Sequence, residues 1–185
     1  MKKITLILTV LILFSFKQPE RIQKVIDHAK WQSTQQVTYD GKYRQLIYPG
    51  GDVPSNVGVC TDVIIRAYRA IDVDLQKLMH EDIVANTSAY NLSKVDANID
   101  HRRVPNMKKF LKRRNAQQPV SNKGTDYKPG DVVFWDVAAG HVGIVTDVKV
   151  PGTDRYNVVH NIGAGPELED FLFRVSIVDH YRWNP

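Results

Sequence analysis

Residues 130–148 read GDVVFWDVAAGHVGIVTDV, and this stretch decides the fold. Two runs of β-branched, apolar and aromatic residues flank an Ala-Ala-Gly turn at 138–140, which is the pattern of two neighbouring β-strands. Two further β-rich runs follow at 156–161 and 175–183, divided by turns that contain Gly and Pro. The sequence therefore predicts an antiparallel meander over residues 130–183.

The part of the chain before this predicted sheet has helical patterns instead. Apolar residues recur there at steps of three and four, as on one face of an α-helix. Helices followed by an antiparallel sheet describe an α+β domain. We expect helices at residues 19–33, 60–71, 74–86 and 105–114, with a turn-rich irregular stretch between the first two.

The N-terminal segment predicts export. A basic start, Met1 to Lys3, precedes an almost entirely apolar run over residues 4–16, which is the build of a secretory signal. The run is shorter than the roughly 20 apolar residues that span a bilayer. We interpret residues 1–17 as a signal peptide or N-terminal membrane anchor, and the alternative is a buried first helix or strand. The expected location is periplasmic or extracellular, with membrane attachment if the signal stays uncleaved.

The remaining residues, 18–185, predict a single domain. No linker, low-complexity segment or internal repeat divides them. A chain of this length is enough for one apolar core and short for two. With one cysteine in the whole sequence, no intramolecular disulfide can support that core.

Cys60 is the candidate nucleophile. It begins the predicted helix 60–71, where the positive end of the helix dipole and free backbone N–H groups favour a thiolate. A lone cysteine is sufficient for a cysteine hydrolase if a histidine folds against it. The alternative is that Cys60 is a small buried apolar residue, as free cysteines often are.

Two histidines are candidates for the partners of Cys60. His141 begins the second predicted strand next to Gly143, which leaves room for a thiol or substrate to approach. His160 lies in the third strand, and a hairpin between these strands brings it toward His141. A second imidazole there would fix the tautomer of the first, as the third member of a catalytic triad does.

The order of these motifs resembles the NlpC-type cell-wall peptidases, bacterial relatives of papain. Closer still is the resemblance to a functionally uncharacterised bacterial branch of that superfamily. The matching stretches, which together cover nearly all of residues 20–183, are GVCTD at 58–62, HED at 80–82, NIDHRRVPN at 98–106, GDVVFW at 130–135, GHVGIV at 140–145 and VVHNIG at 158–163.

This resemblance implies a papain-like α+β fold with the nucleophile at a helix N-terminus packed on an antiparallel sheet. By motif match it implies Cys60 as nucleophile, His141 as base and His160 as orienting residue, with no cofactor. The expected reaction is hydrolysis of a peptide or N-acyl amide bond, with peptidoglycan as the substrate class. The backbone N–H of Cys60 would help to hold the oxyanion.

Arg102 and Arg103 are candidates for substrate binding. An arginine fork grips a carboxylate with two hydrogen bonds, and the peptide stems of the cell wall are rich in carboxylates. The alternative is an internal salt-bridge cluster with Asp100, Glu81 and Asp82. The predicted substrate-binding residues are Asp62, His101, Arg102, Arg103 and Asn161.

The seven basic residues within 102–114 leave a further question open. The chain has a formal net charge of +5, part of which lies in the N-terminal segment. The segment 102–114 is either a solvated helix face or a footprint for an anionic wall polymer or lipid surface. Nucleic acid is not expected, because no known binding motif accompanies the charge.

Two alternatives to a cysteine hydrolase are kept. One is a non-catalytic module on the same fold that binds the cell wall or a partner. The weaker one is a zinc hydrolase using His101, His141 and His160, for which no H-E-x-x-H or comparable spacing exists.

Overall fold

The computed structural model describes residues 19–185. The predicted signal segment 1–17 lies outside the described residues. None of the helices within 19–185 combines the length and apolar composition that crossing a membrane requires.

The four predicted helices are confirmed, each within about two residues of its expected ends. The structure adds a short α4 and two 3-10 turns, η1 and η2, which were not predicted. The helical elements are a first helix at 19–32, α2 at Cys60–Arg69, α3 at Leu75–Ala85, α4 at Thr87–Tyr90, η1 at Asp100–Arg102, α5 at Val104–Arg113 and η2 at Gly124–Asp126.

The four predicted strands are also confirmed, and all pairings of the main sheet are antiparallel. A separate two-stranded parallel pair joins β1, Thr38–Tyr39, to β2, Val57–Gly58. The six strands of the main sheet are β3 at Gln117–Gln118, β4 at Val132–Trp135, β5 at His141–Lys149, β6 at Tyr156–Asn161, β7 at Pro166–Glu169 and β8 at Ile177–Tyr181.

The predicted meander is only partly right. The strand order is β3-β8-β4-β5-β6-β7, so β4 to β7 form a meander while β8 returns to lie between β3 and β4. All four residues of β4 are buried, because this strand is interior to the sheet and covered on both faces.

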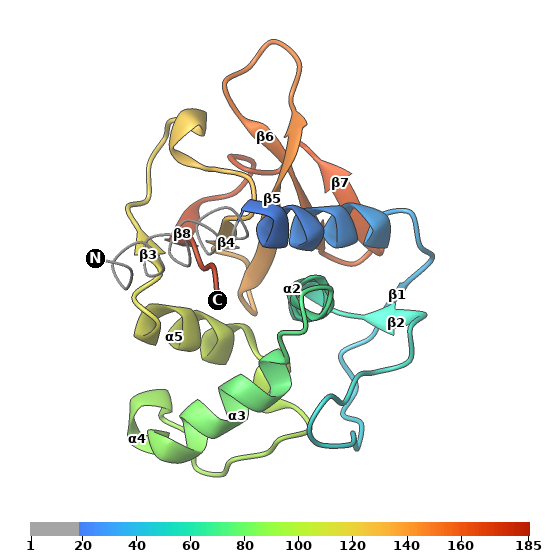
Figure 1. Cartoon of the computed structure of the whole chain (residues 1–185), viewed down its shortest axis with the longest axis vertical. Helices are drawn as coiled ribbons and strands as arrows, with labels where there is room; N and C mark the ends of the chain where they lie inside the picture. Colours follow the sequence, from blue (N-terminus) through green and yellow to red (C-terminus); the bar gives the residue numbers. More distant parts are fainter. Residues whose placement is uncertain (1–18) are drawn as a thin grey trace, which may run out of the picture.

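Two apolar clusters cover the two faces of the sheet. The larger one packs α2 and α5 against the sheet through residues such as Ile64, Phe110, Phe134 and Ile144. The smaller one, on the other face, includes Trp135 and the segment after β7. Figure 1 shows the strands in the upper part, α2 end-on beneath them, and α3, α4 and α5 in the lower part. The observed fold is therefore α+β, as predicted.

Candidate active site

Cys60 is the first residue of α2, as the sequence predicts. Residue 59 is valine, which has no side-chain oxygen to cap the helix. Instead, the Asp62 carboxylate reaches back and accepts the N–H of Val59 at 2.7 Å. The start of α2, and with it the position of Cys60, therefore depends on Asp62.

The environment of the Cys60 thiol differs from the expectation of a favoured thiolate. Burial raises the pKa of this thiol to about 11, although hydrogen bonds from the backbone N–H groups of Val142, Thr61 and Cys60 itself act in the opposite direction. Only 3% of the residue is exposed. Loss of hydration outweighs the helix N-terminus, so the resting group is a neutral thiol.

His141, His160 and Glu169 form a chain of hydrogen bonds. Nε2 of His141 lies 2.9 Å from Nδ1 of His160. Nε2 of His160 lies 2.9 Å from Oε1 of Glu169. Glu169 comes from β7, which pairs with β6, so three neighbouring strands each contribute one member.

This series of hydrogen bonds determines which ring nitrogens of the two histidines carry a proton. The Glu169 carboxylate can only accept, so Nε2 of His160 carries a proton and donates it. Nδ1 of a neutral His160 is then an acceptor, and Nε2 of His141 must donate to it. Nδ1 of a neutral His141 is left with its lone pair, which is the tautomer that a general base requires.

Aromatic rings enclose the two histidines. The ring of His160 lies 4.1 Å from that of Phe171, and the ring of His141 lies 5.7 Å from that of Trp135. Burial lowers the pKa of His141 to about 4, and it lowers the pKa of His160 against the opposing effect of Glu169. Both imidazoles are therefore neutral at pH 7.

Gly143 makes room for the hydrogen-bonded histidines, whereas the sequence predicted that it would make room for a thiol or substrate. A Cβ on Gly143 would lie 2.9 Å from Cβ of His160 and 3.2 Å from the indole of Trp135. The space beside Gly143 is thus filled by His160 rather than left open for a thiol or substrate.

Cys60 and His141 are brought to the same region, but no hydrogen bond joins them. The link runs through β5: the backbone N–H of Val142, the residue after His141, is near enough to the Cys60 sulfur to lower the pKa of the thiol. The turn before His141 is held against α5, where a Cβ on Gly140 would lie 2.9 Å from Val104. Such hydrogen bonds are often long or absent without substrate and close in the complex.

A cleft of about 550 Å³ reaches Cys60. Its walls come from β1, from the residues around η1, from the start of α5 and from the turn before His141. It contains Tyr39, whose pKa is raised by burial and by the nearby Cys60 and Asp62. The lining residues used below are Tyr39, Cys60, Arg103 and Gly140.

Arg102 lines the cleft, but its side chain is almost completely buried in its wall. Its guanidinium donates to both carboxylate oxygens of Asp62, at 2.9 and 2.8 Å, and to the backbone carbonyl of Asp40 at 3.2 Å. Its own carbonyl accepts the Thr61 hydroxyl at 2.9 Å. The fork of Arg102 and the carboxylate of Asp62 are thus already occupied by each other, which supports the salt-bridge alternative for both residues.

The partners predicted for that salt-bridge cluster were wrong. Asp82 binds Arg113 instead, at 2.7 Å. One oxygen of Asp100 accepts the backbone N–H of Asp96, and the other has no partner among the described residues. The actual partner, Asp62, lies 40 residues away in the chain.

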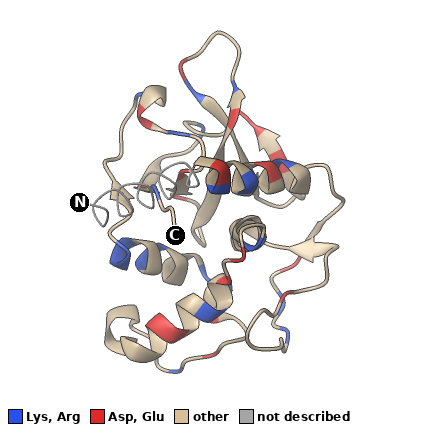
Figure 2. Ribbon diagram, viewed as in Figure 1, with Lys and Arg blue, Asp and Glu red and all other residues tan. Residues whose placement is uncertain are grey.

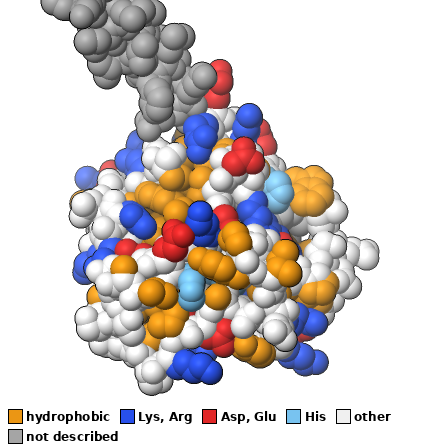
Figure 3. All heavy atoms as spheres, turned by 60° about the horizontal axis from the view of Figure 1, so that its bottom comes forward, with side chains coloured by type: hydrophobic (Ala, Val, Ile, Leu, Met, Phe, Trp, Pro, Cys, Tyr) orange, Lys and Arg blue, Asp and Glu red, His pale blue; other side chains and the backbone are white. Residues whose placement is uncertain are grey.

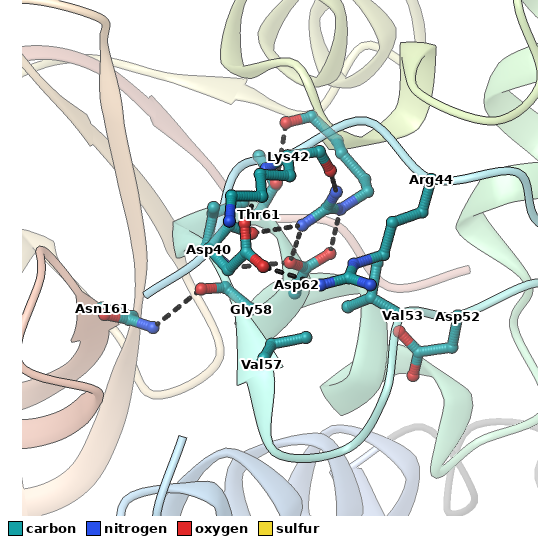
Figure 4. Close-up of polar contacts among 12 residues, drawn as sticks. Asp40, Lys42, Arg44, Asp52, Val53, Val57, Gly58, Thr61, Asp62 and Asn161 are labelled. Atoms are coloured by element: carbon teal, nitrogen blue, oxygen red, sulfur yellow. Dashed lines mark hydrogen bonds and ion pairs between the residues drawn. The ribbon is translucent and has the colours of Figure 1, made fainter. Parts of the chain in front are cut away.

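His101 and Asn161 do not line the cleft. His101 is 3% exposed, burial lowers its pKa to about 4, and its Nδ1 has no partner within residues 19–185. Asn161 donates to the carbonyl of Gly58 at 3.4 Å (Figure 4). Both residues are therefore placed to support the site rather than to contact a substrate.

Arg103, in contrast, is exposed and lines the cleft with Cys60. It makes no ion pair within the described part of the chain. Both adjacent arginines line the cleft, but Arg102 is buried in an ion pair with Asp62 and Arg103 is exposed to solvent.

The zinc alternative has no ligand set in this structure. Within residues 19–185, no three His, Cys, Asp or Glu side chains are grouped so that they could hold a metal ion. His141 and His160 bind each other in a line with Glu169, and His101 is not part of that line.

The basic segment 102–114 is partly neutralised by internal ion pairs. Besides Arg102, these involve Lys108 with Asp179 and Arg113 with Asp82. Figure 2 marks the Lys and Arg positions of α5 in blue on the ribbon, and Figure 3 shows charges of both signs mixed with apolar side chains on the lower face.

Two residues of the site were missed by the sequence reasoning. Glu169 lies on β7, an edge strand that begins with Pro166 and follows a Gly-Ala-Gly segment resembling a turn. Its only signal was the polar–apolar alternation at 167–169. Tyr39 was seen only as part of a turn.

Comparison with known proteins gives the family. Residues 26–183 match the model described as "Domain of unknown function (DUF1287)". The chain belongs to this family. The match spans Cys60, both histidines and Glu169.

A relative of this DUF1287 protein occurs in Escherichia coli (strain K12), where it is described as the uncharacterized protein YijF. The two are 46% identical over 166 residues, which cover 86% of this chain and 80% of YijF. No solved structure was found to match this DUF1287 chain.

Proposed function

We propose that this protein is an exported cysteine hydrolase with an NlpC-like, papain-like fold. It cleaves a peptide or N-acyl amide bond in peptidoglycan through Cys60, His141 and His160. The observation that carries the proposal is the hydrogen-bond chain from Glu169 through His160 to His141, because it leaves Nδ1 of His141 as a free base.

The neutral thiol and neutral imidazole determine the mechanism. With the pKa of Cys60 at about 11 and that of His141 at about 4, a preformed thiolate–imidazolium pair is disfavoured. His141 Nδ1 takes the thiol proton as the sulfur attacks the carbonyl carbon. It then gives this proton to the leaving nitrogen as the C–N bond breaks and a thioester forms.

Water completes the cycle. His141 removes a proton from water, the oxygen attacks the thioester carbon, and the C–S bond breaks to restore the thiol. The oxyanion in both steps accepts hydrogen bonds from the backbone N–H of Cys60 and from the hydroxyl of Tyr39, whose raised pKa keeps it protonated.

Arg103 supplies the preference for the substrate class. It is the exposed cation of the cleft, and a carboxylate beside the cleaved bond can use both arms of its fork. Stem peptides of the cell wall carry such carboxylates.

Mass spectrometry of peptidoglycan treated with the purified protein tests the proposal. The wild type should release new fragments that contain a free carboxyl group, the Cys60→Ala variant should release none, and His141→Ala should release them far more slowly. Because general-base catalysis contributes about 10²–10⁴-fold, His141→Ala should retain a trace of activity.

A second candidate is the non-catalytic wall-binding module. The raised pKa of Cys60 and the missing hydrogen bond to His141 favour it. It predicts that wild type and Cys60→Ala both sediment with peptidoglycan and leave its fragment pattern unchanged. This outcome would rule out the hydrolase.

A further inference from the structure

A groove lies beside the first helix, outside the Cys60 cleft. It consists of two adjoining hollows of about 530 and 500 Å³, which share four lining residues. Both volumes are within the range of small-molecule sites. The groove and the cleft are neighbours along β1, since Thr38 lines the groove and the next residue, Tyr39, lines the cleft. The shared residues are Gln35, Gln36, Val37 and Asn56.

Trp31 forms an aromatic wall of this groove. It is 54% exposed, whereas Trp135 is 1% and Trp183 9% exposed. The ring of His28 packs against it at 5.1 Å. Its carbonyl accepts the backbone N–H of Thr34 at 3.0 Å, which fixes the end of the helix. The indole is therefore a supported flat surface that faces solvent.

The polar lining of the groove is mostly uncharged. Amide and hydroxyl groups offer both donors and acceptors, from Ser33, Gln35, Gln36, Ser55 and Asn56. The side-chain amides of Gln36 and Asn56 form no hydrogen bond within residues 19–185, so they can bind a ligand; the backbone carbonyl of Asn56 accepts the N–H of Thr38.

The charged residues of the groove bind each other. Asp52 pairs with Arg66 at 3.0 Å and with Arg69 at 2.8 Å. Arg66 also donates to the backbone carbonyl of Val57 at 3.1 Å. No lysine lines either hollow. A phosphate or polyanion thus has no free cation to bind in this groove.

We infer that this groove binds a glycan, namely the N-acetylated amino-sugar strand that carries the peptides cleaved at Cys60. The C–H face of a sugar ring packs on the negative face of an indole, and its hydroxyl and acetamido groups match the neutral amides. The identity of this strand rests on the proposed function, while glycan binding itself depends only on the groove.

Binding of N-acetylglucosamine oligosaccharides tests the inference directly. We expect saturable quenching of tryptophan fluorescence in the Cys60→Ala protein, because Trp31 is the exposed emitter among the three tryptophans. By calorimetry, Trp31→Ala should weaken binding at least about tenfold, and Trp31→Phe should restore part of it. Tyr43→Ala removes an exposed aromatic residue that lines neither hollow, and it should bind like the parent.

Activity separates the inference from the proposed function. With an active hydrolase, Trp31→Ala should lower kcat/KM on intact glycan-linked peptidoglycan and leave it unchanged on glycan-free stem peptide. No saturable binding of the oligosaccharide, or binding unaffected by Trp31→Ala, would overturn the glycan site even if hydrolysis persists. Binding of the free stem peptide by Trp31 would assign the groove to peptide and also overturn it.

Discussion

The regions on the two sides of Cys60 are built in opposite ways. Behind it, Asp62 and Arg102 satisfy each other and the nearby backbone groups, so that network is closed. Beside it, the chain Glu169–His160–His141 is satisfied at one end and open at the other. A closed network can hold a residue in place but has no group left to react. An open chain ends in a nitrogen with a free lone pair.

The same contrast divides the adjacent arginines. Both line the cleft, but Arg102 is 6% exposed and uses its fork inside the protein, while Arg103 is exposed. In a 3-10 turn and the residue after it, neighbouring side chains point in different directions. Adjacency in the sequence therefore says little about a shared role.

The largest expected effect concerns the Cys60 thiol beside the hydrogen-bonded series Glu169–His160–His141. With a pKa of about 11, Cys60 should react with iodoacetamide about tenfold faster for each pH unit between 7 and 10, because only the thiolate reacts. A preformed ion pair would instead give a plateau from about pH 6. Rates of mass increase in the folded protein at each pH decide between them.

The closed network should dominate stability. Arg102→Ala leaves Asp62 as a buried unpaired carboxylate, so it should lower the free energy of unfolding by about 3–5 kcal/mol. Arg103→Ala, a matched control, should change it by no more than about 0.5 kcal/mol. Urea denaturation measures both. If Arg102→Ala were as stable as wild type but bound substrate less well, Arg102 would be a substrate-binding residue rather than a structural one.

Acid should destabilise the protein through its buried histidines. The pKa values of His101 and His141 are lowered from 6.5 to about 4, so the unfolded chain binds more protons between these limits. The free energy of unfolding has its full value above pH 6.5. It decreases as the pH falls toward 4, by roughly 3 kcal/mol for each histidine. Denaturation curves at several pH values should show that His101→Gln loses less unfolding free energy on acidification than the wild type does. Its activity at pH 7 should be unchanged.

The smallest effect tests Arg103 alone. Arg103→Lys keeps the charge but loses the planar fork, so kcat/KM on a substrate with a carboxylate should fall about ten- to hundredfold. Arg114→Lys, at the far end of α5, should leave it unchanged. Equal losses on a substrate whose carboxylate is amidated would contradict carboxylate recognition.

Regular elements were predictable from the sequence because their signal is local. The apolar period of α2 and the β-branched runs of β5 and β6 each lie within one stretch of about ten residues. The pairing of β8 with β4 was not predictable, since no local pattern encodes a contact between residues some 45 positions apart.

The site was predictable by residue type but not by environment. The positions of Cys60, His141 and His160 follow from motif order and from the β5–β6 hairpin. The Asp62–Arg102 pair and Glu169 depend on distant contacts. The raised pKa of Cys60 depends on total burial, which overrides the local helix N-terminus.

The place of β8 in the sheet has a consequence for the order of synthesis. Residues 177–181 fill an interior position between β3 and β4, and Trp183 packs on Tyr68 and Phe110 from α2 and α5. Neither the sheet nor the helix layer can close before the ribosome has translated residue 183. The nascent chain therefore cannot complete its core until translation of this domain ends.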